Sequence, residues 1–310
     1  MESKLLGRSG LRVSVVGLGC NNFGQRCDQA QTSAVVAKAL DLGVTLFDTA
    51  DVYGGGGVSE EYLGKALQGR RADVIVATKF GMPMGPGDSK RGGSRRWIMR
   101  AAEDSLRRLG TDWIDLYQIH FPDTATPIEE TLRALDDLVK QGKVRYLGCS
   151  NFAGWQVADA AWTAKTASLS PFVSAQNFYN LLERNVEREL VPACNAHGLG
   201  VLPYFPLASG LLTGRYRRGE SAPQGTRLSA PRFAGALSDK NFDKVEKLAG
   251  FAGDRGHSLL DLAIGWLASQ SHVPSVIAGA TRPEQVEQNV RAAEWKLTAE
   301  ELAKVNEVTA

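Results

Sequence analysis

Four side chains that could move a proton lie at or just beyond the ends of apolar runs in the sequence. Asp48 follows the apolar run at residues 44–47, and Tyr53 comes five residues later. Lys79 directly follows the run at 74–78, and His120 follows the run at 116–119. If these runs are parallel strands, their carboxyl ends meet at one rim. A carboxylic acid, a phenol, an amine and an imidazole would then lie close together at the same end of the strands.

Together these side-chain types suit a general acid. An isolated tyrosine has a pKa of roughly 10 and donates a proton poorly at neutral pH. A nearby Lys79 ammonium should lower the pKa of Tyr53, and Asp48 can keep a buried lysine charged. We expect Asp48, Lys79 and Tyr53 to form a tuned acid worth about 10²–10⁴-fold in rate. His120 can donate to, and orient, a carbonyl oxygen beside Tyr53.

Each of these residues also has an ordinary structural explanation. Asp48 could cap a turn, and Tyr53 could be an unremarkable loop aromatic. Lys79 could be a solvated surface lysine, and His120 a histidine satisfied by structural hydrogen bonds. Taken alone, each explanation is at least as good as the functional one. The joint pattern at three consecutive strand ends favours function.

The elements needed to position these side chains alternate along the chain. The sequence predicts a β-hairpin at residues 4–13, where two short apolar runs flank residues 7–10 (GRSG), which favour a turn. Eight short apolar runs then alternate with amphipathic helices, which is typical of parallel βαβ units. The expected strands are 13–18, 44–47, 74–80, 114–119, 144–148, 172–176, 200–204 and 274–277.

The expected helices are 29–42, 59–67, 94–109, 127–141, 153–166, 186–197, 240–255, 258–270, 283–293 and 298–308. Thr126 and Pro127 predict the start of one helix, and Thr298 with Glu301 predicts a capping box at another. A loop at about 208–237, rich in Gly, Arg and Ser, is long enough to suggest a binding role.

Eight such units predict one α/β domain over residues 1–310. We expect a (β/α)8 TIM barrel with an N-terminal β-hairpin and extra C-terminal helices. An open dinucleotide-binding sheet would want GxGxxG after its first strand. Here residues 17–22 read GLGCNN, so that fingerprint is absent from this position.

Composition narrows the function class. A net charge of +2 gives no reason to expect nucleic acid or an anionic membrane as a partner. No apolar run reaches the roughly 18 residues of a transmembrane helix, and the N-terminus lacks an apolar signal core, so we expect a cytoplasmic protein. The four cysteines, which have no metal-ligand spacing, predict no metal site; they are Cys20, Cys27, Cys149 and Cys194. Oligomeric state is left open.

The sequence resembles the aldo-keto reductase family, in a branch of bacterial reductases similar to potassium-channel β subunits. The resemblance runs from about residue 4 to 308. It is carried by residues 17–19 (GLG), 47–54 (FDTADVYG), 77–80 (ATKF), 117–120 (YQIH), 148–152 (GCSNF), 176–177 (QN), 204–207 (YFPL) and 279–289. It implies a catalytic tetrad of Asp48, Tyr53, Lys79 and His120, with Tyr53 as the acid. It also implies NADP(H) lying across the C-terminal rim.

The resemblance further implies which residues hold the cofactor. Ser150, Asn151 and Gln176 would bind the nicotinamide carboxamide, and Tyr204 would stack on the nicotinamide ring. Arg282 would pair with a 2′-phosphate, at a helix start that favours anions. The remaining expected contacts, to the phosphates, adenine and rim, are Gly19, Cys20, Asn21, Asp48, Phe205, Leu207, Ser209, Gly210, Leu211, Gly214, Arg215, Gly279, Thr281, Gln285, Gln288 and Asn289.

The chain departs from the family pattern at several of these positions. Some members have lysine or arginine where this chain has Gly279 and Gln285. Many have glutamate in place of Gln288 and serine in place of Phe205. NADP(H) is therefore the expected coenzyme, with NAD(H) as the alternative.

Three functions remain open. The first is reduction of a small carbonyl substrate, and the second is a regulatory or binding protein that holds the cofactor with slow or no turnover. The third is a Schiff-base aldolase with Lys79 as nucleophile, which requires a neutral lysine. Candidate substrate-wall residues are Asn21, Phe23, Met82, Trp97 and Phe121.

Overall fold

Eight parallel strands form the centre of the computed structural model, which describes residues 1–230 and 235–309. Their order is β10-β3-β4-β5-β6-β7-β8-β9, so neighbours in the sheet follow the chain except where the last strand returns beside the first. The strands are β3 (Val16–Gly19), β4 (Leu46–Asp48), β5 (Ile75–Phe80), β6 (Ile114–Ile119), β7 (Val144–Ser150), β8 (Phe172–Phe178), β9 (Gly200–Tyr204) and β10 (Val276–Gly279).

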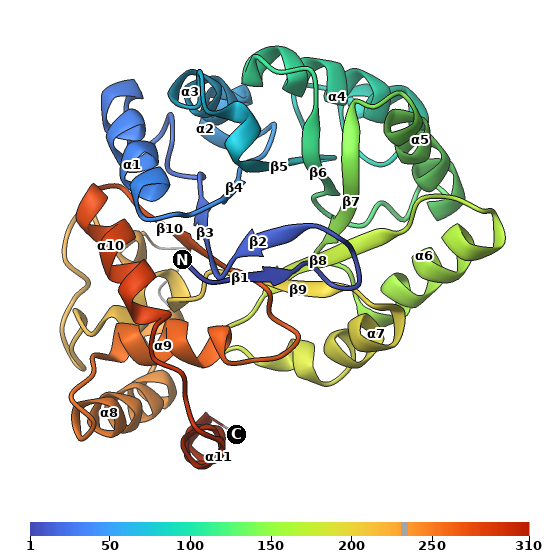
Figure 1. Cartoon of the computed structure of the whole chain (residues 1–310). Coiled ribbons are helices and arrows are strands. Elements are labelled where there is room, and N and C mark those ends of the chain that lie inside the picture. The colour runs from blue at the N-terminus through green and yellow to red at the C-terminus, as the bar shows by residue number, and fades with distance from the viewer. Residues whose placement is uncertain (231–234, 310) are drawn as a thin grey trace.

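The sheet curls into a nearly closed barrel (Figure 1). β9 lies beside β10, and the Val201 N–H donates a hydrogen bond of 2.8 Å to the His272 carbonyl just before β10. The expected TIM-barrel architecture is therefore confirmed. The final strand begins two residues later than expected, at Val276.

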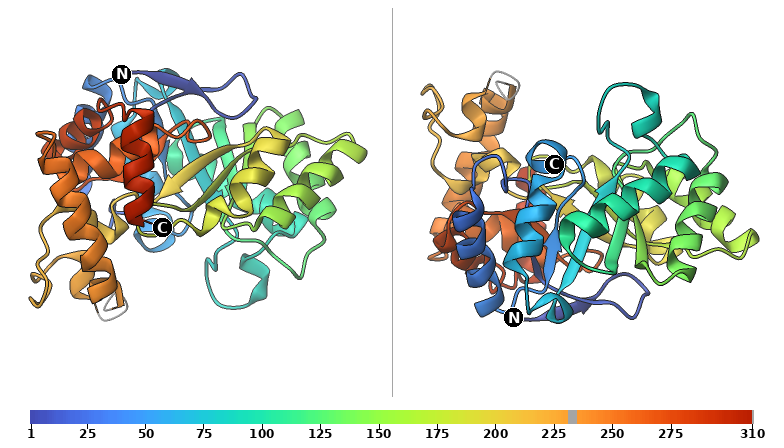
Figure 2. Two further views of the ribbon diagram at one scale, coloured as in Figure 1. Left: turned by 90° about the horizontal axis from the view of Figure 1, so that it is seen from below. Right: turned by 90° about the horizontal axis from the view of Figure 1, so that it is seen from above.

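A β-hairpin closes the amino-terminal end of the barrel. β1 (Ser3–Leu5) pairs antiparallel with β2 (Arg12–Ser14). Leu6 and Val13 are fully buried and pack with the inward-facing apolar side chains of the barrel, which include Leu46, Leu116 and Leu202. In Figure 2 the hairpin lies at one end of the molecule and the loops that follow β5 and β9 lie at the other.

The single strand expected at 13–18 is instead two, β2 and β3. Between them the Ser14 hydroxyl donates to the Val16 carbonyl at 2.7 Å and accepts from the Thr45 N–H at 2.9 Å. These local hydrogen bonds let the chain turn from the hairpin into the barrel. The apolar pattern runs through this bend, which is why the sequence alone did not reveal it.

An outer layer of helices surrounds the barrel, and neighbouring helices pack against each other around it. Their apolar residues recur at helical spacing, so one face is buried against the strands, as with Leu132, Leu135 and Leu138. The helices are α1 (Gln29–Asp41), α2 (Tyr53–Gly56), α3 (Val58–Ala66), α4 (Arg95–Leu109), α5 (Ile128–Lys140), α6 (Gly154–Thr166), α7 (Leu190–His197), α8 (Asp239–Gly253), α9 (Leu259–Ala268), α10 (Pro283–Ala292) and α11 (Ala299–Thr309).

Two helix starts illustrate what the sequence pattern can and cannot give. The capping box before α11 is confirmed, since Thr298 and Glu301 exchange backbone-to-side-chain hydrogen bonds of 2.8 and 3.2 Å. Helix α5 begins at Ile128, one residue after the expected start, and Pro127 occupies the capping position. The Thr126 hydroxyl donates to the Asp123 carboxylate at 2.8 Å instead of capping the helix.

Short 3₁₀ turns fill several connections: η1 (Arg71–Asp73), η2 (Asp88–Lys90), η3 (Asn185–Glu187), η4 (Ala208–Thr213) and η5 (Arg227–Ser229). The helix expected at 186–197 is thus a 3₁₀ turn followed by α7. The last two turns lie in the long loop expected at 208–237, of which residues 231–234 fall outside the described structure. Within the described part of the chain, no helix has the length and apolarity needed to cross a membrane.

Candidate active site

A cavity of about 560 Å³ opens at the carboxyl ends of the barrel strands. Parallel β/α barrels place their chemistry at this face. Residues expected from the sequence that line it are Gly19, Cys20, Asn21, Asp48, Tyr53, His120, Ser150, Asn151, Gln176, Tyr204, Phe205, Leu207, Ser209, Gly210, Arg215, Gly279, Thr281, Arg282 and Gln285.

A buried ion pair lies at the centre of the site. The Lys79 Nζ donates to Asp48 Oδ2 at 2.6 Å and to the Thr49 carbonyl at 2.9 Å, and its side chain is fully buried. The other carboxylate oxygen, Asp48 Oδ1, accepts from the Gln118 and Gln176 amides at 3.2 and 2.9 Å. The sequence analysis missed Gln118, whose place inside an apolar strand was the available signal.

This arrangement keeps Lys79 charged. Burial, the largest effect, lowers the pKa of Lys79, but the Asp48 carboxylate and Tyr53 reverse it, so that the net pKa is raised. A Schiff-base nucleophile must be a neutral amine. The ion pair therefore argues against Lys79 as an aldolase nucleophile.

The Lys79 ammonium lies 5.2 Å from the centroid of the Tyr53 ring. Burial raises the pKa of Tyr53 and outweighs the lowering by the Lys79 charge and hydrogen bond, so the net pKa is above its ordinary value. The expected net lowering is wrong, because the phenol loses more hydration than one ammonium offsets. Tyr53 consequently holds its proton at neutral pH.

His120 stands edge-on to Tyr53, with ring centroids 5.7 Å apart, and stacks on Phe121 at 5.4 Å. Burial, assisted by the Lys79 charge, lowers the pKa of His120 to about 3. The imidazole is therefore neutral at physiological pH and carries one N–H donor. Its Nδ1 is buried and has no hydrogen-bond partner among the described residues.

A run of glycines fixes the position of Tyr53. Gly54, Gly55, Gly56 and Gly57 all have positive φ, between 74° and 97°. A Cβ on Gly54 would lie 2.8 Å from the Ser59 nitrogen. Only glycine adopts such a tight left-handed path without strain, so this run lets the chain turn sharply after Tyr53 and enter α3.

The polar residues at the ends of β7 and β9 form one hydrogen-bond network. Tyr204 donates to Asn151 Oδ1 at 2.8 Å, and Asn151 Nδ2 donates to the His120 carbonyl at 2.9 Å. Ser150 donates to the Gln176 carbonyl at 2.8 Å. Asn151 also has a φ of 60°, a conformation that non-glycine residues hold at a cost of about 1–3 kcal/mol and that is concentrated at functional sites.

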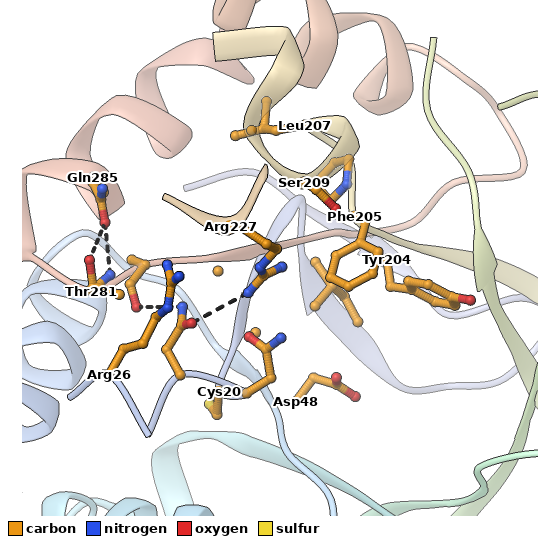
Figure 3. A pocket seen from close by; sticks show the side chains of 18 of the residues that line it. Cys20, Arg26, Asp48, Tyr204, Phe205, Leu207, Ser209, Arg227, Thr281 and Gln285 are labelled. Carbon is orange, nitrogen blue, oxygen red and sulfur yellow. Dashed lines mark hydrogen bonds between the residues drawn. The ribbon is translucent and has the colours of Figure 1, made fainter. Parts of the chain in front are cut away.

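Arg215 and Arg282 also line the pocket and bring positive charge to it. Gln285 accepts from both the backbone N–H and the hydroxyl of Thr281, at 2.8 and 3.1 Å, so its amide oxygen braces this turn (Figure 3). Two further residues that line the cavity, Phe205 and Ser209, have a positive backbone φ.

Four expected cofactor residues do not line the cavity: Leu211, Gly214, Gln288 and Asn289. Leu211 is 1% exposed and belongs to the apolar core, since the 3₁₀ turn directs it inward. Asn289 is buried, and Gln288 is exposed outside the cavity. Of the expected substrate-wall residues, Asn21 and Phe121 do line it. Phe23 is fully buried, Trp97 lines a different cavity, and Met82 lines neither.

Two arginines that the sequence analysis missed cross the pocket. Arg26, in the loop after β3, donates to the Gly225 carbonyl at 3.3 Å. Arg227 donates to Asn22 Oδ1 at 3.4 Å, and its guanidinium lies 4.9 Å from the centroid of the Phe205 ring (Figure 3). They join two loops that are some 200 residues apart in sequence. The richness of the 208–237 loop in arginine was the one available signal.

The model of the aldo/keto reductase family matches residues 15–310 of the chain. The protein belongs to this family. Similar relatives of this aldo/keto reductase include a "Probable voltage-gated potassium channel subunit beta" from Oryza sativa subsp. japonica, 39% identical over 94% of this chain and 91% of that protein. The "Uncharacterized oxidoreductase YrpG" of Bacillus subtilis (strain 168) is 39% identical over 99% of this chain and 96% of its own.

An enzyme relative is the "L-glyceraldehyde 3-phosphate reductase" of Escherichia coli (strain K12). It is 34% identical over 99% of this aldo/keto reductase and 92% of its own length. The family membership and the relatives named as oxidoreductases support an oxidoreductase that acts on a small carbonyl substrate.

Proposed function

We propose that this aldo/keto reductase reduces aldehydes or ketones to alcohols with NADPH, and that Tyr53 donates the proton. The observation that carries the proposal is the buried Lys79–Asp48 pair, at 2.6 Å, beside a phenol and a neutral imidazole in one pocket. The family match supports the same reaction class.

The pocket suits a dinucleotide. Its volume of about 560 Å³ falls in the usual range for cofactor sites, roughly 300–1,000 Å³. Its aromatic and amide side chains, Tyr204, Asn151 and Gln176, suit a nicotinamide, while Arg215 and Arg282 suit phosphates. When bound, NADPH would supply the hydride that the carbonyl carbon accepts.

The chain's own residues handle the proton. A carbonyl oxygen between Tyr53 and His120 would accept a hydrogen bond from each, and the neutral imidazole orients it. Tyr53 then gives its hydroxyl proton to that oxygen, and the bond from the phenolic oxygen to hydrogen breaks. The Lys79 ammonium stabilises the phenolate that remains, and Asp48 keeps that ammonium charged.

Tyr53→Phe tests the acid. We expect turnover to fall by about 10²–10⁴-fold, while NADPH affinity stays close to that of the parent protein. Consumption of NADPH with a panel of aldehydes, including L-glyceraldehyde 3-phosphate, measures the first, and quenching of tryptophan emission by NADPH measures the second. Tyr62→Phe, on the partly exposed face of α3, is the matched control. Unchanged turnover in Tyr53→Phe excludes this acid.

The alternative is a cofactor-holding regulatory protein. It is favoured by relatives named as potassium channel β subunits at 37–39% identity. Such a protein would bind NADPH tightly yet consume it slowly or not at all across the same panel. The assay therefore separates the two functions, since both require binding and only one requires turnover.

A further inference from the structure

A second cavity, of about 220 Å³, lies between the segment after β4, the loop after β5 and helix α4. It shares no lining residue with the candidate active site. Its lining consists of Asp51, Gly56, Met84, Lys90, Trp97, Arg100, Ala101, Asp104 and Arg108. Nothing in the proposed reductase mechanism uses these side chains.

Two buried polar side chains in this cavity lack partners. Asp51 is 1% exposed, and neither of its carboxyl oxygens has a hydrogen-bond partner in the described structure. Trp97 is 4% exposed, and its indole Nε1 is also without one. Folded proteins rarely leave buried polar atoms unsatisfied, so these atoms point to a bound polar group.

The charges around the cavity are mainly positive. Lys90, Arg100 and Arg108 contribute three cationic side chains. Arg108 is engaged by the buried Glu60 at 2.7 Å, and Asp104 by Arg107 at 2.7 Å. Arg100 is only loosely paired with Asp104, at 3.8 Å, and Lys90 forms no ion pair with any side chain that the structure describes. Two cations are therefore left to face a ligand.

The Asp51 carboxyl group contributes a hydrogen-bond donor to this cavity and not a negative charge. Burial and the neighbouring Glu60 raise the pKa of Asp51 to about 8, although Arg108, the adjacent Val52 backbone N–H and Lys79 oppose them in part. At neutral pH the carboxyl group is therefore mostly protonated and can donate a hydrogen bond. The indole N–H of Trp97 can only donate, so the unsatisfied groups inside the cavity offer donors.

We propose that this cavity binds a tetrahedral oxyanion of the phosphate or sulfate type. The ligand is either the free ion or the terminal group of a small phosphorylated molecule. Lys90 and Arg100 would meet its charge at the opening, while Trp97 and Asp51 would donate to its oxygens inside. A metal cation or a polyamine would instead face three positive side chains.

Sulfate is the sharpest probe, because its charge is constant between about pH 6 and 9. Calorimetric titration of the protein saturated with NADP⁺ keeps the arginines of the other pocket occupied, and a parallel titration without nucleotide removes dependence on the proposed coenzyme. We expect saturable binding that Arg100→Gln weakens about tenfold. Arg96→Gln, an exposed change on the same helix, should have no effect.

The dependence on pH identifies the site. Sulfate affinity of the parent protein should fall as pH rises through about 8, because Asp51 then becomes an anion that faces the ligand. Asp51→Asn keeps a donor and should hold its affinity over the same range. Glu60, Lys79, Arg108 and Tyr117 lie near Asp51, and Lys90, Arg100 and Asp104 line the same cavity. All of these groups are the same in both proteins, so the difference isolates the Asp51 carboxyl group. Circular dichroism checks that each variant is folded.

Two further ligands separate the sources of the oxyanion. Binding of glycerol 3-phosphate at least tenfold tighter than inorganic phosphate identifies a phosphorylated molecule, and equal affinities identify the free ion. Absence of saturable sulfate binding overturns the proposal. So does binding that Arg100→Gln leaves unchanged, or a preference for the diamine putrescine over sulfate.

Discussion

At the scale of single residues, burial sets the proton state of two rings, and one buried ammonium acts on both. Burial lowers the pKa of His120 and raises the pKa of Tyr53, while the Lys79 charge adds to the first shift and opposes the second. Both rings are consequently neutral at physiological pH, so each has a proton to share with an acceptor. Asp48 makes this possible by offsetting the cost of burying the lysine.

His120 predicts a loss of stability on the acid side. Its pKa in the folded protein is about 3, below the ordinary 6.5, so the stability it contributes is complete above pH 6.5 and is lost as pH falls toward 3. Between pH 7 and pH 5 this amounts to about 2 kcal/mol. Between pH 7 and pH 5, the free energy of unfolding of His120→Asn, measured with urea, should therefore fall by about 2 kcal/mol less than that of the parent protein. Equal losses in parent and variant would contradict this, and His197→Asn, partly exposed on α7, is the control.

At the same scale, the sequence predicted that Asp48, Tyr53, Lys79 and His120 would come together, but not the direction of every pKa shift among them. Asp48, Lys79 and His120 end adjacent parallel strands, so their meeting at one rim follows from topology. The net pKa of Tyr53 depends on how deeply packing buries the phenol, which residue types alone do not encode. Leu211 shows the same limit, since the 3₁₀ turn that directs it into the core has no periodic signature.

At the scale of elements, the glycine run after β4 positions Tyr53. Gly54 and Gly55 have φ angles of 74° and 80°, and both lie in the short helix that begins with Tyr53. Of these two, only Gly54 is tightly enclosed, because the Phe23 carbonyl and the Ser59 N–H approach within 3 Å of where a Cβ would stand. The run thus fixes Tyr53 through backbone contacts.

Gly54→Ala should destabilise the protein and displace Tyr53. The substitution combines left-handed strain with a clash against backbone atoms, and we expect a loss of about 2–3 kcal/mol in denaturant unfolding together with a fall in kcat. Gly55→Ala is the matched control, because Gly55 has a similar φ but open space where a Cβ would stand, so it should cost only about 1 kcal/mol. Equal costs for the two variants would show that enclosure is irrelevant.

Element boundaries were predictable where a local rule acted alone. The capping box of Thr298 and Glu301 was recoverable, because both partners lie within one turn of chain. The start of α5 was not, because Thr126 finds the nearby Asp123 carboxylate instead. The bridging arginines Arg26 and Arg227 join loops that are distant in sequence, and no short-range pattern reveals such contacts.

At the scale of the whole molecule, the alternation of eight apolar runs with helices sufficed to predict the barrel. The hairpin was also predicted. That it closes the amino-terminal end of the barrel follows only from the packing of Leu6 and Val13 onto the interior side chains. The fold therefore separates stability at one end from chemistry at the other.

Leu6→Ala tests this separation. Removing a fully buried leucine side chain should lower the free energy of unfolding by about 2–5 kcal/mol. The affinity for NADPH, measured by fluorescence, should remain within about twofold of the parent, because the change lies at the opposite end from the pocket. Leu5→Ala, whose side chain is partly exposed, is the control and should cost far less. A large change in NADPH affinity would show that the two ends are coupled.

The packing at the hairpin end of the barrel also has a consequence for the route of ligands. Among the described residues, apolar side chains pack between the hairpin and the ion pair, and the cavity opens at the opposite rim. We therefore expect ligands to enter and leave at that rim, past the two loops that the arginines join. If the proposed reaction holds, the molecule that binds deeper in the cavity should arrive first and leave last, which predicts an ordered binding sequence.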